Sequence, residues 1–328
     1  MALDSDRIVH NSSAPGQATF RLGAKEVALT HLDRVYYPDP GYTKGEVLDY
    51  YLAVAPYLLP HLRKRPLTLE RWPEGVDDDS FFQKNASSYF PAWLRNFPVE
   101  RKDRQKIIHY PLVEDEADLL YLVNQGTITF HSQMARVDDP EHPDLMVLDV
   151  DPPEGAPQPR GRRAAPAGGG AAAGHQAAGA TATPFRQAAE VAFLLREQLR
   201  AEGWDPLVKT SGKRGLHLAF RLSGELDFDA ARAQLKALFA EVAAHHPKLL
   251  TTEIRKNKRG GRVYLDALRM SEGATIVPPY VARPTPTATV SMPIAWDELE
   301  TSPDGNLFTI KTSPARLEKT GDLWAPLL

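Results

Sequence analysis

The chain has 328 residues, 42% of them hydrophobic, so it can build a sizeable core. Its formal net charge is −3, so nucleic acid could bind only through a local basic patch. It has no cysteine, which excludes disulfides and zinc–thiolate sites and fits a cytoplasmic location. Neither a signal peptide nor a run of the ~20 apolar residues that span a membrane is apparent, so we expect no membrane association.

The first 143 residues are predicted to form an N-terminal α/β unit. Residues 44–63 have the apolar spacing of an amphipathic helix, and residues 121–131 are typical of a helix followed by a strand. Between them, the stretch LERWPEGVDDDSFFQKN (69–85) combines aromatic and basic residues. Adjacent Phe81 and Phe82 would point to opposite faces of a strand, so one is expected in the core. The other is then free to stack on a nucleobase, unless both are buried.

Residues 156–184 have a different composition from the rest of the chain. They are almost entirely Ala, Gly, Pro, Thr and Arg, with no large apolar side chain to bury. Such a segment cannot offset the entropy of becoming ordered, so we predict a flexible insertion. Its arginines Arg160, Arg162 and Arg163 either contact an anionic partner or simply keep a linker solvated.

Strand and helix patterns alternate on either side of this insertion. Asp227 is placed to cap the second of two predicted helices. The order is the βαββαβ pattern, so we predict an α+β catalytic unit over residues 144–283 with strand order 4-1-3-2. Proline-rich residues 284–328 are expected to wrap the surface of one compact two-lobed domain. The predicted strands cover 144–151, 206–210, 215–222 and 262–268, and the helices cover 185–202 and 228–245.

This topology brings three carboxylates together. Asp149 and Asp151, in LDVDPPEG, share a face because they are two residues apart on the first strand, and Asp266 lies on the neighbouring fourth strand. Carboxylates this close raise one another's pKa unless cations lie among them, and oxygen ligands favour Mg²⁺ or Mn²⁺. We predict a two-metal site suited to in-line attack at phosphorus. The alternative is that the aspartate pair merely begins a loop.

The turn KTSGKRGLH (209–217) is predicted to hold a triphosphate. Its glycines let backbone N–H groups approach phosphate oxygens, and Lys213 and Arg214 add positive charge. An ordinary solvated hairpin is the alternative, because the spacing is not that of a P-loop. His217 is either a phosphate contact or a hydrogen-bonded core residue. Arg259 and Arg283 flank the same site in sequence and either contact phosphate or belong to a solvated face.

Together these segments resemble the polymerase domain of bacterial DNA ligase D, an end-joining polymerase of the archaeo-eukaryotic primase superfamily. The resemblance covers about residues 20–299 and implies a primase-like fold. It rests on LTHLDRVYYP (29–38), GYTKGEVLDYY (41–51), RPLTLERWPEGVD (65–77), FFQKN (81–85), LDVDPPEG (148–155), KTSGKRGLH (209–217), RGGRVYLD (259–266) and GATIVPPY (273–280).

The resemblance implies a role for each candidate residue. The catalytic metal ligands are Asp149, Asp151 and Asp266. The nucleotide-binding residues, including Lys213 from the charged turn, are His131, Ser211, Lys213, Arg214, Gly215, His217, Arg259 and Arg283. The residues for the DNA 5′-phosphate and template are His31, Arg34, Lys44, Arg71, Phe81, Phe82 and Lys84.

The implied activity is template-directed nucleotidyl transfer that fills gaps and extends ends in bacterial non-homologous end joining. The resemblance further implies two Mn²⁺ or Mg²⁺ ions, an NTP or dNTP substrate with a preference for ribonucleotides, and association with the nucleoid. Implied partners are gapped DNA with a 5′-phosphate, Ku, and a DNA ligase. No KxDG adenylation motif or histidine-rich phosphoesterase segment is visible, so the ligase is expected to act in trans.

Two other functions stay open at this stage. A metal-dependent nuclease explains the carboxylates but not the triphosphate turn. A non-catalytic DNA-end-binding module is disfavoured because all three carboxylates are present. The chain also departs from the family pattern, with His31 in place of asparagine, Arg34 and Arg214 in place of lysine, and Val150 in place of leucine. Positive charge is kept at the two arginines, so phosphate binding is expected to survive.

Overall fold

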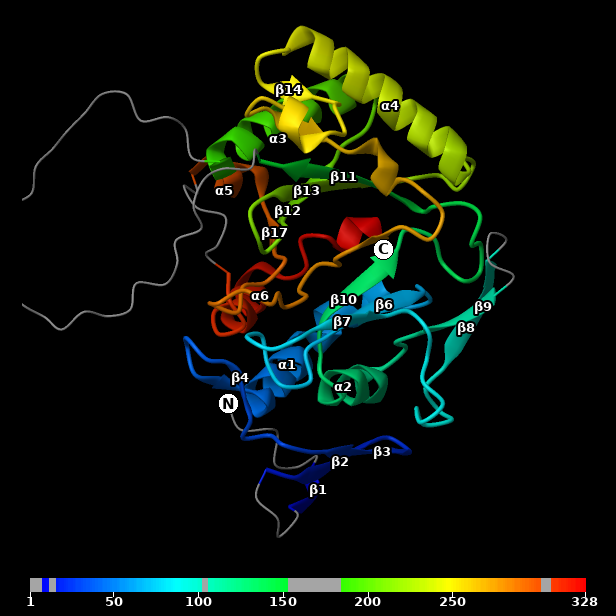
Figure 1. The fold of residues 1–328 in the computed structure, drawn as a ribbon, viewed down its shortest axis with the longest axis vertical. Helices are drawn as coiled ribbons and strands as arrows, with labels where there is room; N and C mark the ends of the chain where they lie inside the picture. Colours follow the sequence, from blue (N-terminus) through cyan, green and yellow to red (C-terminus); the bar gives the residue numbers. More distant parts are fainter. Residues whose placement is uncertain (1–7, 12–15, 102–105, 153–183, 302–307) are drawn as a thin grey trace, which may run out of the picture.

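The computed structural model describes residues 8–11, 16–101, 106–152, 184–301 and 308–328, which form a mixed α+β structure of two lobes built around separate sheets (Figure 1). The predicted insertion at 156–184 lies outside the described residues except for Pro184, so its role stays a prediction. Among the described helices, none is both long and apolar enough to cross a membrane.

The first lobe is built on a six-stranded sheet with the order β14-β15-β11-β13-β12-β17. The four predicted strands are β11, β12, β13 and β15, and their observed order β15-β11-β13-β12 confirms the predicted 4-1-3-2 arrangement. The edges are extended by β14, which is parallel to β15, and by β17, which is antiparallel to β12. The bounds are β11 Leu145–Asp151, β12 Leu207–Thr210, β13 Leu216–Arg221, β14 Leu250–Thr251, β15 Val263–Leu265 and β17 Pro293–Ile294.

Helices α3 (Pro184–Ala201) and α4 (Phe228–His245) cover one face of this sheet (Figure 1). Asp227 caps α4 as predicted, since its side chain accepts from the backbone N–H of Ala230 at 2.7 Å. Leu148 and Val150 belong to the hydrophobic core with these helices. Because side chains alternate along a strand, Asp149 and Asp151 point to the opposite face, toward the second lobe.

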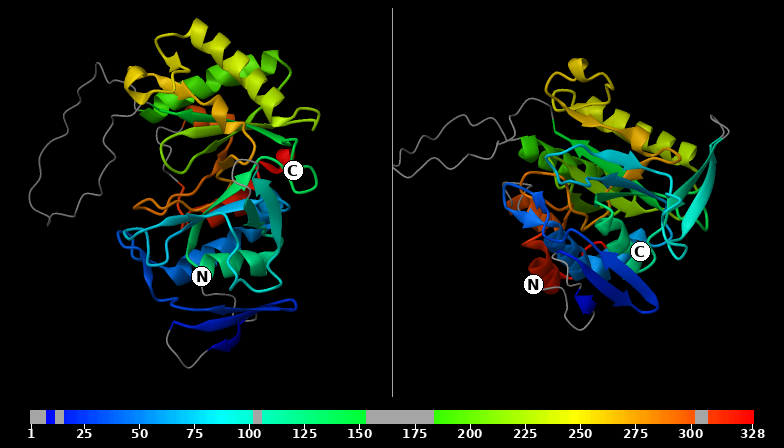
Figure 2. Two further views of the ribbon diagram at one scale, coloured as in Figure 1. Left: turned by 45° about the vertical axis from the view of Figure 1, so that its right-hand side comes forward. Right: turned by 60° about the horizontal axis from the view of Figure 1, so that its bottom comes forward.

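The second lobe packs α1 (Lys44–Leu62) and α2 (Glu116–Asn124) against the sheet β16-β10-β6-β7. Helix α1 begins where expected because Thr43 and Glu46 form a reciprocal capping box. A three-stranded sheet of β1, β2 and β3 lies at the far end of this lobe (Figure 1 and the left view of Figure 2). The remaining bounds are β1 Ile8–Asn11, β2 Ala18–Leu22, β3 Lys25–Leu29, β4 Val35–Tyr37, β5 Tyr42–Thr43, β6 Leu67–Arg71, β7 Phe81–Gln83, β8 Asn96–Arg101, β9 Lys106–Pro111, β10 Thr127–Gln133 and β16 Thr275–Ile276.

The C-terminal residues join the two lobes. Beyond residue 284 the chain supplies β17 to the first sheet, together with α5 (Trp296–Thr301) and α6 (Ser313–Thr320). Trp324 is 3% exposed and donates from its indole N–H to the Val208 carbonyl at 3.2 Å. This segment is therefore more deeply embedded than a surface wrap. The domain boundaries at 143 and 284 stay predictions.

Candidate nucleotide and metal site

Asp149 and Asp151 line one cavity of about 210 Å³ together with most of the predicted nucleotide-binding residues. Asp149 is 5% exposed, whereas Asp151 at the end of β11 is exposed to solvent. Side chains from β10, from the β12–β13 turn and from the segment after β15 complete the walls. The predicted residues in the lining are His131, Asp149, Asp151, Ser211, Lys213, Arg214, His217 and Arg283, and the others are Arg269, Thr275, Ile276 and Val277.

The carboxyl group of Asp149 is electrostatically strained in this cavity. Burial, and then repulsion from Asp151, raises its pKa to about 7 against the opposing attraction of Arg269. On the neighbouring strand β13, His217 lies with Nε2 3.5 Å from Asp149 Oδ1. A buried carboxylate beside a second one is a group that a cation would stabilise.

Asp266 is not part of the strand that was predicted for residues 262–268. Strand β15 ends at Leu265, and Asp266 caps a short 3₁₀ helix, Ala267–Arg269. Its Oδ1 accepts from the backbone N–H of Leu268 at 2.9 Å. This local bond to a backbone amide two residues ahead turns the chain and ends the strand. Asp266 is not among the residues that line the cavity.

Arg269 connects Asp149 and Asp266, and the sequence analysis missed it. Its Nη2 and Nε lie 2.9 Å and 3.0 Å from Asp149 Oδ2, and Nε lies 3.7 Å from Asp266 Oδ2. In the described part of the chain, no three His, Asp or Glu side chains are arranged as a ready cluster for an ion. The sequence feature that could have identified Arg269 is its position three residues after Asp266, because one helical turn brings residues with this spacing together.

The donor set nevertheless fits a hard divalent cation. Asp149 and Asp151 offer only oxygen atoms, which Mg²⁺ and Mn²⁺ prefer. The ion pair with Arg269 shows that Asp149 requires a positive counter-charge in its buried position. The assignment of Asp149, Asp151 and Asp266 as metal ligands stays a prediction.

The turn between β12 and β13 is held closely against the end of β11. Ser211 Oγ accepts from the backbone N–H groups of Lys213 at 3.2 Å and Gly215 at 3.1 Å. A Cβ on Gly215 would lie 2.5 Å from the Val150 carbonyl oxygen, so only glycine allows this approach. Burial, and then Arg283, lowers the pKa of Lys213. The turn thus brings Lys213 and Arg214 into the lining of the cavity that Asp149 and Asp151 share.

Arg283 is a buried cation with two unsatisfied donor atoms. It is 7% exposed and lines the cavity, and its Nε and Nη1 make no hydrogen bond to any described residue. Burial lowers its pKa, whereas Glu70 raises it. Buried guanidinium N–H groups without an acceptor destabilise a protein unless a bound anion accepts hydrogen bonds from them. This arginine is the clearest mark of an anion site in the structure.

His131 pairs with a carboxylate that the sequence analysis did not single out. Its Nε2 lies 3.1 Å from Glu70 Oε2 on the adjacent strand β6. Burial lowers the pKa of His131, although Glu70 opposes this change. The pair stands beside the exposed Phe82, whose ring meets the imidazole edge-on at 5.5 Å. His131 therefore links the cavity of Asp149 to the aromatic residues of β7.

Arg259 is placed away from the cavity lining. Its guanidinium stacks 3.8 Å above the ring of Tyr264 and donates to the carbonyls of Glu253 and Ile254. These contacts satisfy the charge locally, since an arginine over an aromatic face is attracted by the ring quadrupole. Its predicted contact with the nucleotide stays a prediction.

The residues predicted for the 5′-phosphate gather at the N-terminus of α1. Lys44 donates from Nζ to the Thr30 carbonyl at 2.7 Å, and burial, then Arg34, lowers its pKa to about 8. Arg34 pairs with Glu74 at 2.8 Å. His31 is exposed, with a positive φ of 55°. A helix N-terminus with two cations is a favourable position for an anion.

The aromatic pair on β7 differs from expectation. Phe81 is 46% and Phe82 62% exposed, so the prediction that one belongs to the core is wrong. The reason is that β7 is the edge strand of its sheet, with β6 as its one neighbour among the described strands. Exposed Lys84 follows directly.

Arg71 lies behind this surface and supports it. It is 7% exposed, its guanidinium lies 5.2 Å from the Phe81 ring, and it donates to Gln83 Oε1 at 2.7 Å. It also donates to the hydroxyl of Tyr89 at 2.8 Å. Tyr89 is 59% exposed and adds an aromatic residue that was not predicted. Contact of Arg71 with DNA stays a prediction.

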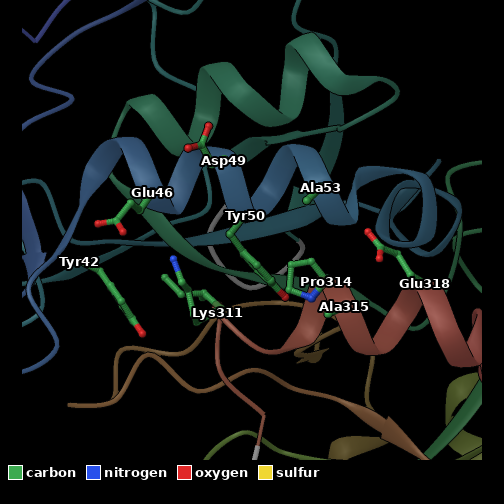
Figure 3. A pocket seen from close by; sticks show the side chains of 10 residues that line it. Tyr42, Glu46, Asp49, Tyr50, Ala53, Lys311, Pro314, Ala315 and Glu318 are labelled. Atoms are coloured by element: carbon green, nitrogen blue, oxygen red, sulfur yellow. The ribbon is translucent and has the colours of Figure 1, made fainter. Parts of the chain in front are cut away.

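A second cavity, of about 340 Å³, lies between α1 and α6 (Figure 3). Tyr42, Tyr50 and Lys311 are among its walls, and it shares no lining residue with the cavity of Asp149. Burial raises the pKa of Asp49 in its wall to about 6. It offers no convergent cations, so the smaller cavity is the candidate site.

Comparisons with known proteins give a consistent result. Residues 43–169 and 180–324 match the model of the family described as LigD, primase-polymerase domain. The multifunctional non-homologous end joining protein LigD of Mycolicibacterium smegmatis is 30% identical over 305 residues, which are 92% of this chain and 36% of that protein. The bifunctional LigD of Bacillus subtilis is 30% identical over 297 residues, 90% of this chain and 43% of that protein. The chain therefore spans less than half the length of these curated relatives.

A solved structure shares the fold over nearly its full length. The polymerase domain from Mycobacterium tuberculosis ligase D, in complex with DNA, aligns with a TM-score of 0.79 and 29% identity. The alignment covers 92% of this chain and 97% of that one. The predicted primase-like α+β fold is thereby confirmed.

Proposed function

Because the chain belongs to the LigD primase-polymerase family, we propose that it is a template-directed nucleotidyltransferase that fills gaps and extends DNA ends during non-homologous end joining. One observation carries this proposal. The buried guanidinium of Arg283, whose Nε and Nη1 bond to no described residue, lines the same cavity as Asp149 and Asp151. Anion-binding cations beside paired carboxylates are the arrangement that a metal-bound triphosphate requires.

Asp149, Asp151 and Asp266 would hold two divalent cations, Mn²⁺ or Mg²⁺, which supply activation of the primer 3′-hydroxyl and neutralise the leaving pyrophosphate. Binding there requires Arg269 to release Asp149 Oδ2. The released guanidinium would remain at the cavity wall, where it can contact a phosphate oxygen.

The triphosphate would lie along the β12–β13 turn. Lys213 and Arg214 line the cavity from this turn, and Arg283 faces them. Ser211 would fix the shape of the turn, because its Oγ accepts from the backbone N–H groups of Lys213 and Gly215, and Gly215 allows the close approach to β11. Fixed cations at this position would stabilise charge that develops in the transition state. His131, held by Glu70, would border the nucleotide, and His217 and Arg259 are further proposed contacts.

The DNA end would bind across the second lobe. Lys44, Arg34 and His31 would hold the 5′-phosphate at the N-terminus of α1 and so set the length of gap that is filled. Phe81 and Phe82 would stack on template bases, with Lys84 beside the backbone and Arg71 supporting the pair. We further propose a preference for ribonucleotides, Ku and a DNA ligase as partners, and location at the nucleoid.

Primer extension on a one-nucleotide gapped duplex with Mn²⁺ and NTPs tests this function. The assay compares a 5′-phosphate with a 5′-hydroxyl at the gap, and compares the unaltered protein with Asp149→Ala and Arg283→Met. We expect NTP-dependent extension that the phosphate stimulates and that both substitutions remove. Cleavage without NTP would instead identify a nuclease. Tight binding of the phosphorylated end without extension would identify a non-catalytic end-binding module.

A further inference from the structure

A row of three polar side chains crosses the catalytic sheet on the face that carries Asp149. Asp149 on β11 is directly opposite His217 on β13, and His217 is directly opposite Lys209 on β12. The His217 ring joins the other two, with Nε2 3.5 Å from Asp149 Oδ1 and Nδ1 2.7 Å from Lys209 Nζ. All three side chains are buried, and Lys209 is 0% exposed. Direct cross-strand neighbours of this kind fix one another's orientation.

The other contacts of Lys209 identify it as the donor in this row. Lys209 Nζ lies 2.5 Å from the Ser291 hydroxyl oxygen. That hydroxyl donates its single proton to the Thr210 carbonyl at 3.1 Å, so toward Lys209 it can only accept. The ring of Trp324 lies 5.4 Å from the same nitrogen and presents its electron-rich face. The Ser291 hydroxyl and the Trp324 ring thus both receive from the lysine. Burial lowers the pKa of Lys209, which Asp149 opposes, and in its ammonium form the lysine has no lone pair with which to accept from His217 Nδ1.

The hydrogen bond from Lys209 affects Asp149 on β11 through the imidazole ring of His217. If Nδ1 accepts from Lys209, the neutral ring carries its proton on Nε2, which faces Asp149. We propose that Lys209 is a positioning residue: it fixes the Nε2–H tautomer of His217 and thereby holds the carboxylate of Asp149 in its orientation. The proposal rests on the proposed function only in treating Asp149 as a metal ligand. Partners that orient a ligand typically change metal affinity or activity by 10- to 100-fold.

The first test measures the tautomer in the unaltered protein. The full chain is labelled with ¹⁵N-histidine and studied without metal by long-range ¹H–¹⁵N correlation at neutral pH. His217 is one of 10 histidines, so its signals are assigned by their loss in His217→Gln. We expect the pattern of Nε2–H, with Nδ1 unprotonated. A pattern of Nδ1–H, or of a doubly protonated ring, would overturn the proposal.

The second test measures Mn²⁺ binding by electron paramagnetic resonance. Lys209→Met keeps the length of the side chain but removes the donor, and we expect Mn²⁺ to bind about 10- to 100-fold more weakly. Removing a positive charge near the site would by itself strengthen cation binding, so a weaker affinity reports the lost orientation. An unchanged or tighter affinity in a cooperatively folded variant would contradict the role of Lys209.

A pair of His217 variants covers the case in which Lys209→Met does not fold. The amide nitrogen of His217→Gln can take the place of Nε2, whereas that of His217→Asn takes the place of Nδ1. We expect the glutamine variant to bind Mn²⁺ at least tenfold more tightly than the asparagine variant, and equal affinities would contradict the proposal. None of these measurements needs polymerase activity. Failure of primer extension with the expected tautomer and affinities would sink the proposed function alone.

Discussion

The guanidinium of Arg269 approaches Asp149 with two nitrogen atoms, at 2.9 Å and 3.0 Å from the same carboxylate oxygen. Asp149 is almost fully buried, and Asp151 repels it from the end of the same strand. The arginine comes from a short 3₁₀ helix that Asp266 begins. The six-stranded sheet therefore holds the buried carboxylate of Asp149 with a cation from the 3₁₀ helix that follows β15.

Arg269→Gln should destabilise the protein when no metal is bound. The substitution leaves the buried carboxylate of Asp149 without its counter-ion, which should lower the free energy of unfolding by about 1–2 kcal/mol, discounted because Arg269 is 43% exposed. Urea unfolding in EDTA and in Mn²⁺ measures the effect, and the difference should shrink in Mn²⁺. Arg21→Gln, which breaks an exposed pair with Glu26, is the control and should be nearly neutral. Equal losses with and without Mn²⁺ would contradict a cation site at Asp149.

Gly215→Ala should disable the site by steric pressure. The new methyl would meet the Val150 carbonyl oxygen at 2.5 Å and Asp151 Oδ1 at 3.3 Å, so β11 or the turn must move. We expect a stability loss of about 1–3 kcal/mol and a much larger relative loss of gap filling. Thermal unfolding and primer extension measure the two effects. Gly224→Ala is the control, because nothing lies within 4 Å there and only its positive φ of 81° is strained. Full activity of Gly215→Ala would show that the turn does not need this close approach.

Recognition of the 5′-phosphate should weaken as pH rises past about 8. The pKa of Lys44 is lowered to about 8 by burial and then by Arg34. The lysine is cationic below that value and neutral above it, so the affinity for a phosphorylated end should be full below pH 8. Above it, the affinity should fall by up to about tenfold per pH unit. Fluorescence anisotropy with 5′-phosphate and 5′-hydroxyl duplexes between pH 7 and 9.5 measures this. Lys44→Arg stays charged throughout and should flatten the profile. A profile that is the same in both proteins would exclude Lys44 as the titrating group.

Phe82→Ala should weaken binding to single-stranded template without destabilising the fold. The side chain is 62% exposed, so little packing is lost, whereas stacking on one base is typically worth about 1–3 kcal/mol. We expect roughly 5- to 150-fold weaker binding of a duplex with a template overhang. Binding of a blunt duplex should change little, and Phe82→Leu should be intermediate because it keeps apolar area but not the ring. Equal weakening for both duplexes would show that Phe82 does not read the template strand.

The sequence by itself determined the elements whose signals are local. The capping residues Thr43 and Asp227 set the beginnings of α1 and α4. The spacing of Asp149 and Asp151 put them on one face of a strand, and the βαββαβ order fixed which strands are neighbours. These features follow from bonds and periodicities within a few residues, together with a topology that allows few alternatives.

The tertiary structure decided how charges are paired, because pairing depends on distances between segments far apart in the chain. Asp266 bonds to the backbone of its own turn, and Arg269 reaches across 120 residues to Asp149. The buried guanidinium of Arg71 packs against the exposed Phe81 ring on β7. Phe81 and Phe82 are both exposed because β7 is an edge strand. Lys209 faces His217 only because β12 and β13 pair in one register, and a single-residue shift would turn its side chain to the opposite face.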